Sequence, residues 1–294
     1  MKISYYPGCT LKNNAKNFED STLCAMKQLG VEVEELSRWN CCGTVYSLAT
    51  DDLMHHLAPI RNLIRVKEAG SDSVMTLCAM CYNTLKRADE RIKNDPESLE
   101  RINEFMYLEK TEYKGDVKVL HLLELLRDEV TFEKIAEKVK NPLKNLKVAN
   151  YYGCFLVRPR GIGLPGEDVE NPTIMEKFMS LLGADAVDFP YKTECCGAYQ
   201  TVDKPEIVAE RTNQILTSAQ KQGAEVVVVS CPLCAFNLDR RQEETVQLYP
   251  EFKNMPVLYF TQLLALALGC GEEALGFDLN YIDPKPVLKE KGLI

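Results

Sequence analysis

A pattern of five cysteines occurs twice in this sequence of 294 residues, and this repeat constrains the fold more than any other feature. Each copy has a single cysteine, then an adjacent pair, then a Cys-x-x-Cys motif. The gaps are 31 and 35 residues in the first copy, and 40 and 34 in the second. The ten cysteines are Cys9, Cys41, Cys42, Cys78, Cys81, Cys154, Cys195, Cys196, Cys231 and Cys234.

The residues around these cysteines also repeat in the same order. The matched blocks are YYPGC (5–9) with YYGC (151–154), NCCGTVY (40–46) with ECCGAYQ (194–200), VMTLCAMCYNTL (74–85) with VVVSCPLCAFNL (227–238), and VLHLLELL (119–126) with VLYFTQLLAL (257–266). Four matched blocks in one order indicate an internal duplication. The unit of about 145 residues agrees with the usual size of a domain, about 150 residues.

Both copies alternate short β-rich runs with helical segments. The expected strands cover 3–6, 31–36, 73–77 and 117–120, then 147–152, 184–189, 226–230 and 257–259. The expected helices cover 15–29, 51–69, 81–92 and a segment from 122, then 173–182, 204–222 and a segment after Cys231. Such alternation is typical of βα units around a parallel sheet. We therefore predict an α/β fold of two pseudo-symmetric Rossmann-like repeats, with parallel sheets flanked by helices.

The first predicted repeat covers residues 1–143 and the second covers 144–294. Residues 140–145, which include Pro142, form the expected linker, and 94–115 form an expected helical insertion. The cysteines in each copy closely follow strands. Because sites in open α/β sheets form beyond the carboxyl ends of the strands, we expect each set of five to converge there.

Composition limits the kinds of partner and the cellular compartment. The chain has 35 basic and 43 acidic residues, a net charge of −8, which disfavours general binding to nucleic acid or anionic membranes. The sequence shows no signal peptide and no apolar segment long enough to span a membrane. We therefore expect a cytoplasmic protein. Its cysteines are then expected as metal ligands or redox groups rather than as a disulfide framework.

Thiolates are soft ligands, and sets of four bind zinc or iron–sulfur clusters. Five cysteines per copy are one more than a zinc site or a cubane [4Fe–4S] cluster needs. An adjacent pair suits a site in which one thiolate bridges two irons. The residues alone leave two possibilities open, an unusual cluster or four ligands with one reactive thiol.

The doubled pattern resembles the cysteine-rich CCG domain family, and within it the B subunits of heterodisulfide reductases from methanogenic archaea. The resemblance extends from Cys9 to about Gly269. It implies two noncubane [4Fe–4S] clusters, each held by the five cysteines of one copy. It also implies reduction of the mixed disulfide of coenzyme M and coenzyme B to two thiols.

The sequence contains no Cys-x₂-Cys-x₂-Cys-x₃-Cys-Pro run of the ferredoxin type. The resemblance therefore implies separate electron donors: a C subunit with two cubane [4Fe–4S] clusters and a flavin-containing A subunit, together with a hydrogenase or formate dehydrogenase. Because a disulfide takes two electrons and each cluster delivers one, we expect the substrate between the two sites. Alternatives are a CCG protein of another disulfide reductase or of a lactate- or glycolate-type oxidoreductase, and a structural zinc-binding protein.

Several residues outside the cysteine sets are also candidates. His121 ends an expected strand, and we predict that it donates a proton to a leaving thiolate. Arg158 and Arg160 lie in a loop that is longer in the second copy, and with Lys204 they are candidates for binding the anionic groups of the substrate. Cys24 and Cys270 lie outside the pattern, and we expect both to pack in the core.

Overall fold

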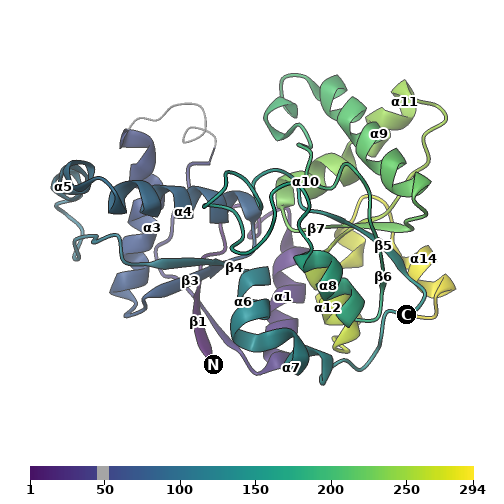
Figure 1. Cartoon of the computed structure of the whole chain (residues 1–294), viewed down its shortest axis with the longest axis horizontal. Helices are drawn as coiled ribbons and strands as arrows, with labels where there is room; N and C mark the ends of the chain where they lie inside the picture. Colours follow the sequence, from purple (N-terminus) through teal and green to yellow (C-terminus); the bar gives the residue numbers. More distant parts are fainter. Residues whose placement is uncertain (45–52) are drawn as a thin grey trace.

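The computed structural model describes residues 1–44 and 53–294, and it contains two four-stranded parallel sheets (Figure 1). Their strand orders are β2-β1-β3-β4 and β6-β5-β7-β8, so the two repeats share one topology. This confirms the predicted α/β fold. The strands are β1 (Lys2–Tyr5), β2 (Glu32–Glu35), β3 (Ser73–Thr76), β4 (Lys118–His121), β5 (Lys147–Tyr151), β6 (Asp185–Val187), β7 (Val226–Val229) and β8 (Val257–Tyr259).

Helices follow the strands in both repeats. Those of the first are α1 (Lys16–Leu29), η1 (Leu53–His56), α3 (Leu57–Glu68), α4 (Ala79–Lys93), α5 (Pro96–Phe105), α6 (Leu122–Leu125), η2 (Leu126–Thr131) and α7 (Phe132–Ala136). Those of the second are α8 (Ile174–Leu181), η3 (Ala198–Gln200), α9 (Pro205–Lys221), α10 (Pro232–Ala235), η4 (Phe236–Arg240), α11 (Gln242–Leu248), α12 (Phe260–Ala267), α13 (Glu272–Leu275), η5 (Phe277–Leu279) and α14 (Lys285–Glu290).

These elements agree with the expected ones at most positions. The helix α5 occupies the expected insertion 94–115. The start of the helix expected over 51–69, and the last two residues of the block 40–46, lie outside the described residues. The domain boundary at 143/144 stays a prediction, although one sheet ends at His121 and the other begins at Lys147.

The position of each strand explains its sequence. The central strand β7 is a run of four valines, all buried, as expected for a parallel strand covered by helices on both faces. The edge strand β2 has the sequence EVEE and remains largely exposed. In the first sheet, β2 lies on one side of β1 and β3 lies on the other; in the second sheet, β6 and β7 lie in the same way on either side of β5. The carboxyl ends of β1 and β3, and of β5 and β7, therefore form topological switch points, where ligands bind in such sheets.

The two repeats pack against each other through a helix of each. In Figure 1, α1 of the first repeat lies beside α12 of the second. The ring of Phe18 on α1 stacks on Tyr259 at 4.2 Å between centroids, and Ser21 Oγ lies 2.7 Å from Thr261 Oγ1. These buried contacts join the repeats into one core.

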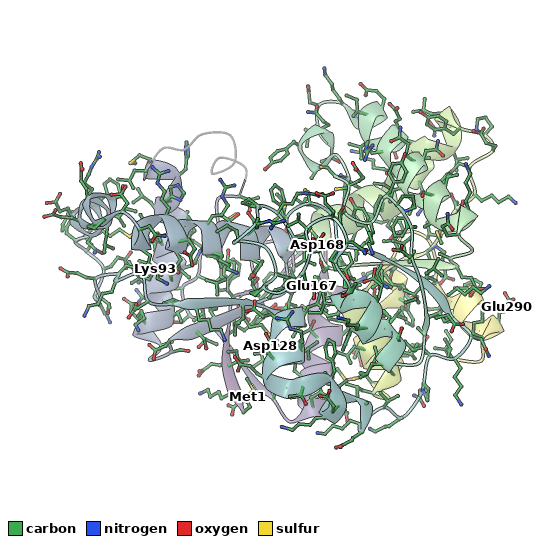
Figure 2. The ribbon with its side chains drawn as sticks, viewed as in Figure 1. Met1, Lys93, Asp128, Glu167, Asp168 and Glu290 are labelled. Atoms are coloured by element: carbon green, nitrogen blue, oxygen red, sulfur yellow. A yellow bond between two sulfur atoms is a disulfide. The ribbon has the colours of Figure 1, made fainter. Side chains whose placement is uncertain are left out.

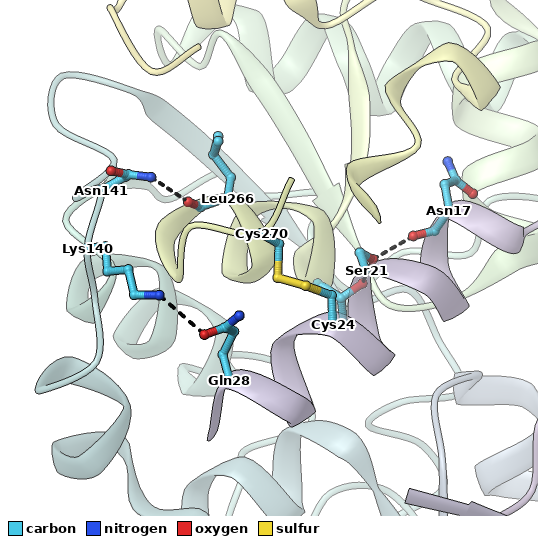
Figure 3. Close-up of a disulfide and its surroundings, with 9 residues drawn as sticks. Asn17, Ser21, Cys24, Gln28, Lys140, Asn141, Leu266 and Cys270 are labelled. Carbon is cyan, nitrogen blue, oxygen red and sulfur yellow. Dashed lines mark hydrogen bonds between the residues drawn. A yellow bond between two sulfur atoms is a disulfide. The ribbon is translucent and has the colours of Figure 1, made fainter. Parts of the chain in front are cut away.

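A disulfide crosses the same interface, and it corrects one expectation (Figure 3). Cys24 on α1 is bonded to Cys270 just after α12, at a sequence separation of 246. Both were expected to pack in the core as cysteines outside the ligand sets. Cys270 is buried and Cys24 packs against the core, but the two are bonded to each other and not free, which the prediction missed. Each lies on a separate apolar segment, and only the packing of α1 on α12 brings their Cα atoms to 6.3 Å, within disulfide range.

Candidate functional site

The five cysteines of the first repeat lie in contact beyond the carboxyl ends of their strands. Cys9 Sγ lies 3.7 Å from Cys41 Sγ, and Cys42 Sγ lies 3.6 Å from Cys81 Sγ. The thiols of Cys41 and Cys42 are hydrogen-bonded, as are those of Cys78 and Cys81. The order in space is therefore Cys9, Cys41, Cys42, Cys81 and Cys78.

The second repeat has the same arrangement at the equivalent positions. Cys195 forms hydrogen bonds with Cys154 and Cys196. Cys196 Sγ lies 3.6 Å from Cys234 Sγ, and Cys234 in turn hydrogen-bonds to Cys231. All ten cysteines of the two sets are free of disulfides.

The two sets meet at their Cys-x-x-Cys motifs. The thiols of Cys78 and Cys231 lie close enough to shift each other's pKa, and Ala79 N donates to Ser230 O at 3.3 Å. The ten thiols therefore form one continuous row, which we call the thiol line. Sequence spacing predicted two separate points of convergence, and the structure brings them into contact.

Glycines allow the first cysteine of each set to approach the Cys-x-x-Cys motif. Gly8 and Gly153 have φ values of +73° and +64°, and each precedes the single cysteine of its repeat. A Cβ atom on Gly8 would lie 3.0 Å from Cys81 Sγ, and one on Gly153 would lie 3.2 Å from Cys234 Sγ. Both positions therefore favour glycine for its conformation and for space. The sequence already pointed to these two glycines, because a glycine directly precedes the single cysteine in both copies.

Two buried tyrosines hold the adjacent cysteine pairs in place, and sequence reasoning missed them. Tyr6 donates its hydroxyl hydrogen to Asn40 O at 2.9 Å, immediately before the first pair. Tyr151 makes the equivalent hydrogen bond to Glu194 O at 2.6 Å, immediately before the second pair. Tyr6 and Tyr151 stand three residues before the first cysteine of their repeats, so the duplication retains the same brace twice.

The cysteines of the thiol line differ widely in pKa, and these differences indicate that the line binds cations. Hydrogen bonds from Cys154 and Cys196 lower the pKa of Cys195 to about 2, and hydrogen bonds from Cys41 and Cys81 hold the pKa of Cys42 well below its ordinary value. The hydrogen bond to Cys195 raises the pKa of Cys154 far above normal. Neighbouring thiols therefore cannot all ionise unless cations compensate them.

Ten clustered thiols, six of them buried, fit a polynuclear iron group better than an isolated ion. Cys78 and Cys231 are N-caps of α4 and α10. Interaction with Cys234 and Cys78 holds the pKa of Cys231 well below its ordinary value, whereas interaction with Cys231 raises that of Cys78. Among residues 1–44 and 53–294, no group of three or more His, Cys, Asp or Glu side chains is arranged to hold a single metal ion. The fit to iron and sulfide rests on five soft ligands per set.

His121 lies next to the place where the two sets meet, and it is fully buried. Its Nε2 lies 2.9 Å from Leu77 O, and its Nδ1 accepts a hydrogen bond from Leu123 N at 3.2 Å. Burial lowers its pKa to about 4, so the ring is neutral near pH 7. The ring thus positions the backbone before Cys78, and its predicted role as a proton donor stays a prediction.

The three predicted anion-binding residues have different surroundings. Arg158 donates to Thr193 O at 2.6 Å and to Glu170 Oε1 at 2.9 Å, so its guanidinium already has partners. Arg160 is exposed in the same loop, and Lys204 is exposed before α9. Figure 2 labels Glu167 and the exposed Asp168, near the end of this loop, at the centre of the view. The anion-binding roles stay predictions.

A cavity of about 540 Å³ lies between the repeats beside the cysteines, and sequence reasoning missed it. Thr10, next to Cys9, contributes to one wall, and Pro232 and Leu233 of the second Cys-x-x-Cys motif contribute to another. Residues from α1, η4, β8 and η5 complete the lining. The cavity is thus lined by sequence neighbours of Cys9 and of Cys231 and Cys234, and not by the cysteines themselves.

Known proteins resemble this chain over nearly its whole length. The 8-methylmenaquinol:fumarate reductase membrane anchor subunit of Wolinella succinogenes is 34% identical over 283 residues, which cover 96% of this chain and 97% of the relative. The B subunit of the Ferredoxin/F(420)H(2)-dependent CoB-CoM heterodisulfide reductase of Methanosarcina acetivorans is 32% identical over 96% of this chain and 94% of its own.

A solved structure shares the fold. The structure of a hypothetical protein from Helicobacter pylori superposes with a TM-score of 0.75 at 15% identity, covering 95% of this chain and 51% of that one. Within the part of the chain that the structure describes, no helix has the length and apolar character needed to cross a bilayer.

The family comparison matches both repeats. The model of the cysteine-rich domain (CCG) matches residues 3–86 and 148–239. These two ranges contain all ten cysteines of the thiol line, together with Gly8, Gly153 and the two tyrosine braces. The chain therefore belongs to the CCG cysteine-rich domain family.

Proposed function

We propose that this chain reduces the mixed disulfide of coenzyme M and coenzyme B, using two noncubane [4Fe–4S] clusters held by the ten cysteines of the thiol line. At a coarser level the chain is an iron–sulfur subunit of the heterodisulfide reductase type, as its family and its relatives indicate. The observation that carries the finer proposal is the contact between Cys78 and Cys231, which joins the two sets of ligands.

The reaction explains why two sets should touch. Cleavage of the sulfur–sulfur bond consumes two electrons and two protons and releases two thiols. When bound, the two clusters would supply one electron each. The chain positions the ligands: Gly8 and Gly153 let the cysteine loops approach, while Tyr6 and Tyr151 hold the adjacent pairs. Proton donation by His121, and anion binding by Arg158, Arg160 and Lys204, belong to the same proposal.

The electrons must come from partners. The relatives are subunits of multi-subunit enzymes by name, and this chain contains no ferredoxin-type cysteine run. We propose a C subunit with two cubane clusters and a flavin-containing A subunit as donors, coupled to a hydrogenase or formate dehydrogenase.

The relative from Wolinella succinogenes supports a second candidate. Its name describes part of a quinol:fumarate reductase, and its 34% identity extends over nearly all of both chains. In this candidate the same cysteine sets transfer electrons from a quinol and reduce no disulfide. Both candidates require redox-active iron, and they differ in the small molecule that binds.

The experiment that tests the proposal begins with iron, sulfide and zinc content of the anaerobically purified chain. About eight irons with matching sulfide support two clusters of four. A reduced viologen then serves as the electron donor, with the coenzyme M–coenzyme B disulfide as substrate and cystine as the control substrate. Selective release of the two coenzyme thiols supports the proposal. Two zincs without iron, or equal rates with cystine, would contradict it.

A further inference from the structure

The duplication creates two equivalent places beside the Cys-x-x-Cys helices, and only one of them is filled. In the first repeat, the loop after Cys154 covers the start of α4. Asn83 Nδ2 donates to Phe155 O at 2.9 Å and to Arg158 O at 2.6 Å. The hydroxyl of Tyr82, which is fully buried, lies 3.4 Å from Gly163 O. Loop and tyrosine together close this place.

The equivalent place in the second repeat is the cavity of about 540 Å³. The matched blocks pair Tyr82 with Ala235, which lines the cavity with a single methyl group. The loop is also shorter here, because α1 begins seven residues after Cys9, whereas α8 begins twenty residues after Cys154. A small side chain and a short loop therefore leave this place open.

The walls of the cavity are aromatic and apolar. The rings of Phe236 and Tyr281 meet edge to face at 6.4 Å, and Tyr259 contributes a third ring. At the surface, Leu279 and Tyr281 are 53% and 60% exposed, which is high for large apolar side chains. Exposed apolar groups around a concavity mark a binding site for a ligand or partner. The volume lies within the range of about 300–1,000 Å³ that is usual for small-molecule sites.

The two charged residues in the lining have partners already. Arg241 donates to Glu244 Oε1 at 2.6 Å and to Thr201 O at 2.5 Å. The carboxylate of Asp239 accepts hydrogen bonds from the backbone of Tyr281 at 2.8 Å and of Ile282 at 3.0 Å. The other polar groups in the lining are uncharged amides and hydroxyls. An anionic ligand would therefore find no unpaired cation among these lining residues.

We propose that this cavity binds an uncharged aromatic ligand of the size of a quinol ring, and that Ala235 is the residue that admits it. This proposal assumes the proposed function, namely that the cysteine sets hold redox-active iron. It adds the class of small molecule that binds in the cavity next to Cys9 and the second Cys-x-x-Cys motif. The charged heterodisulfide belongs to a different class of ligand. The apolar walls hold the ring, and the amide of Asn14 in the lining provides a hydrogen bond to one of its hydroxyl groups. The amides of Asn17 and Asn280 bond to each other and to neighbouring groups of the protein.

The test uses two redox-inert probes with one ring system, 1-naphthol and naphthalene-1-sulfonate. Binding to the anaerobic iron-loaded chain is measured by isothermal titration calorimetry. We expect 1-naphthol to bind with one site per chain, and the sulfonate to bind at least tenfold more weakly. Equal affinity for the two probes, or no binding of 1-naphthol, would overturn the proposal.

Two variants and a control locate the binding. Ala235→Tyr introduces the residue of the closed repeat and should weaken 1-naphthol binding at least tenfold. Leu279→Asp changes an exposed side chain at the cavity and should also weaken it, which keeps the test decisive if Ala235→Tyr does not fold. Ala136→Tyr places the same substitution on an exposed position of α7 and should have no effect. Unchanged affinity in Leu279→Asp and in folded Ala235→Tyr would refute the site.

Iron content and disulfide reduction are measured on the same samples. If the unsubstituted chain contains iron but does not bind 1-naphthol, only the proposed ligand of the cavity is contradicted. If the unsubstituted chain contains no iron when purified, the proposed function itself is contradicted. The two failures are therefore distinguishable.

Discussion

The thiols of Cys78 and Cys231 face each other across the boundary between the two repeats and shift each other's pKa. Each is the first cysteine of its Cys-x-x-Cys motif and the N-cap of the helix that follows. The contact joins two ligand sets that lie 153 positions apart in the sequence. If the reaction uses both sets at once, disrupting either set should abolish it.

The equivalent buried cysteines Cys42 and Cys196 test this dependence. We expect Cys42→Ala and Cys196→Ala each to lose about half of the iron, because each removes a ligand of one set. Disulfide reduction should fall at least 100-fold in both variants, because one electron cannot complete the cleavage. Iron analysis and the viologen-linked assay measure the two effects. A variant that keeps half of the activity would show that the sets work independently.

The tyrosine braces should stabilise one set each. Tyr6→Phe removes the hydrogen bond to Asn40 O, and Tyr151→Phe removes the one to Glu194 O. Each variant loses one part-buried hydrogen bond, which contributes about 0.5–1.5 kcal/mol. Asn40 O retains Asn62 Nδ2 as a donor, so the effect of Tyr6→Phe should be the smaller one. We expect faster loss of iron to a chelator, confined to one set, with EPR showing which. Tyr113→Phe is the control, because this buried hydroxyl bonds to Asp89 instead. Equal iron loss in all three variants would contradict a local role.

Substitution of His121 separates a positioning role from proton donation. His121→Asn and His121→Phe both disturb the bridge between Leu77 O and Leu123 N, so we expect iron content to fall in both, more in the phenylalanine variant. A pure proton donor would leave iron content intact and would change the pH profile of disulfide reduction. Iron analysis and that profile decide between the two roles.

Asp239 should give the stability a measurable pH dependence. Burial raises the pKa of this carboxyl from 3.8 to about 7. Between these values the folded chain binds the proton and the unfolded chain has released it, so stability falls as pH rises from about 4 to 7 and levels off above. The difference in unfolding free energy between the parent chain and Asp239→Asn should fall by up to about 4 kcal/mol over this window. Urea unfolding at a series of pH values measures it, and a flat difference would contradict it.

The disulfide between Cys24 and Cys270 should stabilise the fold without affecting iron. It closes a loop of 246 residues, and such cross-links contribute about 2–4 kcal/mol. We expect Cys24→Ser to lower the melting temperature and to leave iron content unchanged. Peptide mapping without reductant should show the linked pair. Free thiols at both positions in the protein from cells would contradict the bond.

The parallel sheets and their strand order were predictable because local patterns carry them. The valines of β7 and the alternation in β2 are legible without any partner. The gathering of each cysteine set followed from strand ends and topology. The disulfide was not predictable, because no local pattern records that α1 packs on α12.

The cavity was hidden for a different reason. The difference between Tyr82 and Ala235 is visible in the matched blocks, yet it gains meaning only when the two places beside the helices are known to be equivalent. Similarly, the roles of Tyr6 and Tyr151 depend on a carbonyl more than 30 residues away. These contacts join segments far apart in the sequence. They could not be predicted, because the periodicity of a sequence reports only on residues close together along the chain.

The packing of α1 against α12 sets an order of events during synthesis. Phe18 is synthesised more than 240 residues before its partners Tyr259 and Phe260. The first repeat therefore cannot complete its core while the chain is still growing. The five cysteines of the first set are all made by Cys81, but the contact between Cys78 and Cys231 forms only once the second repeat has emerged. We therefore expect the paired arrangement of the two cysteine sets to form only after the second repeat has been synthesised.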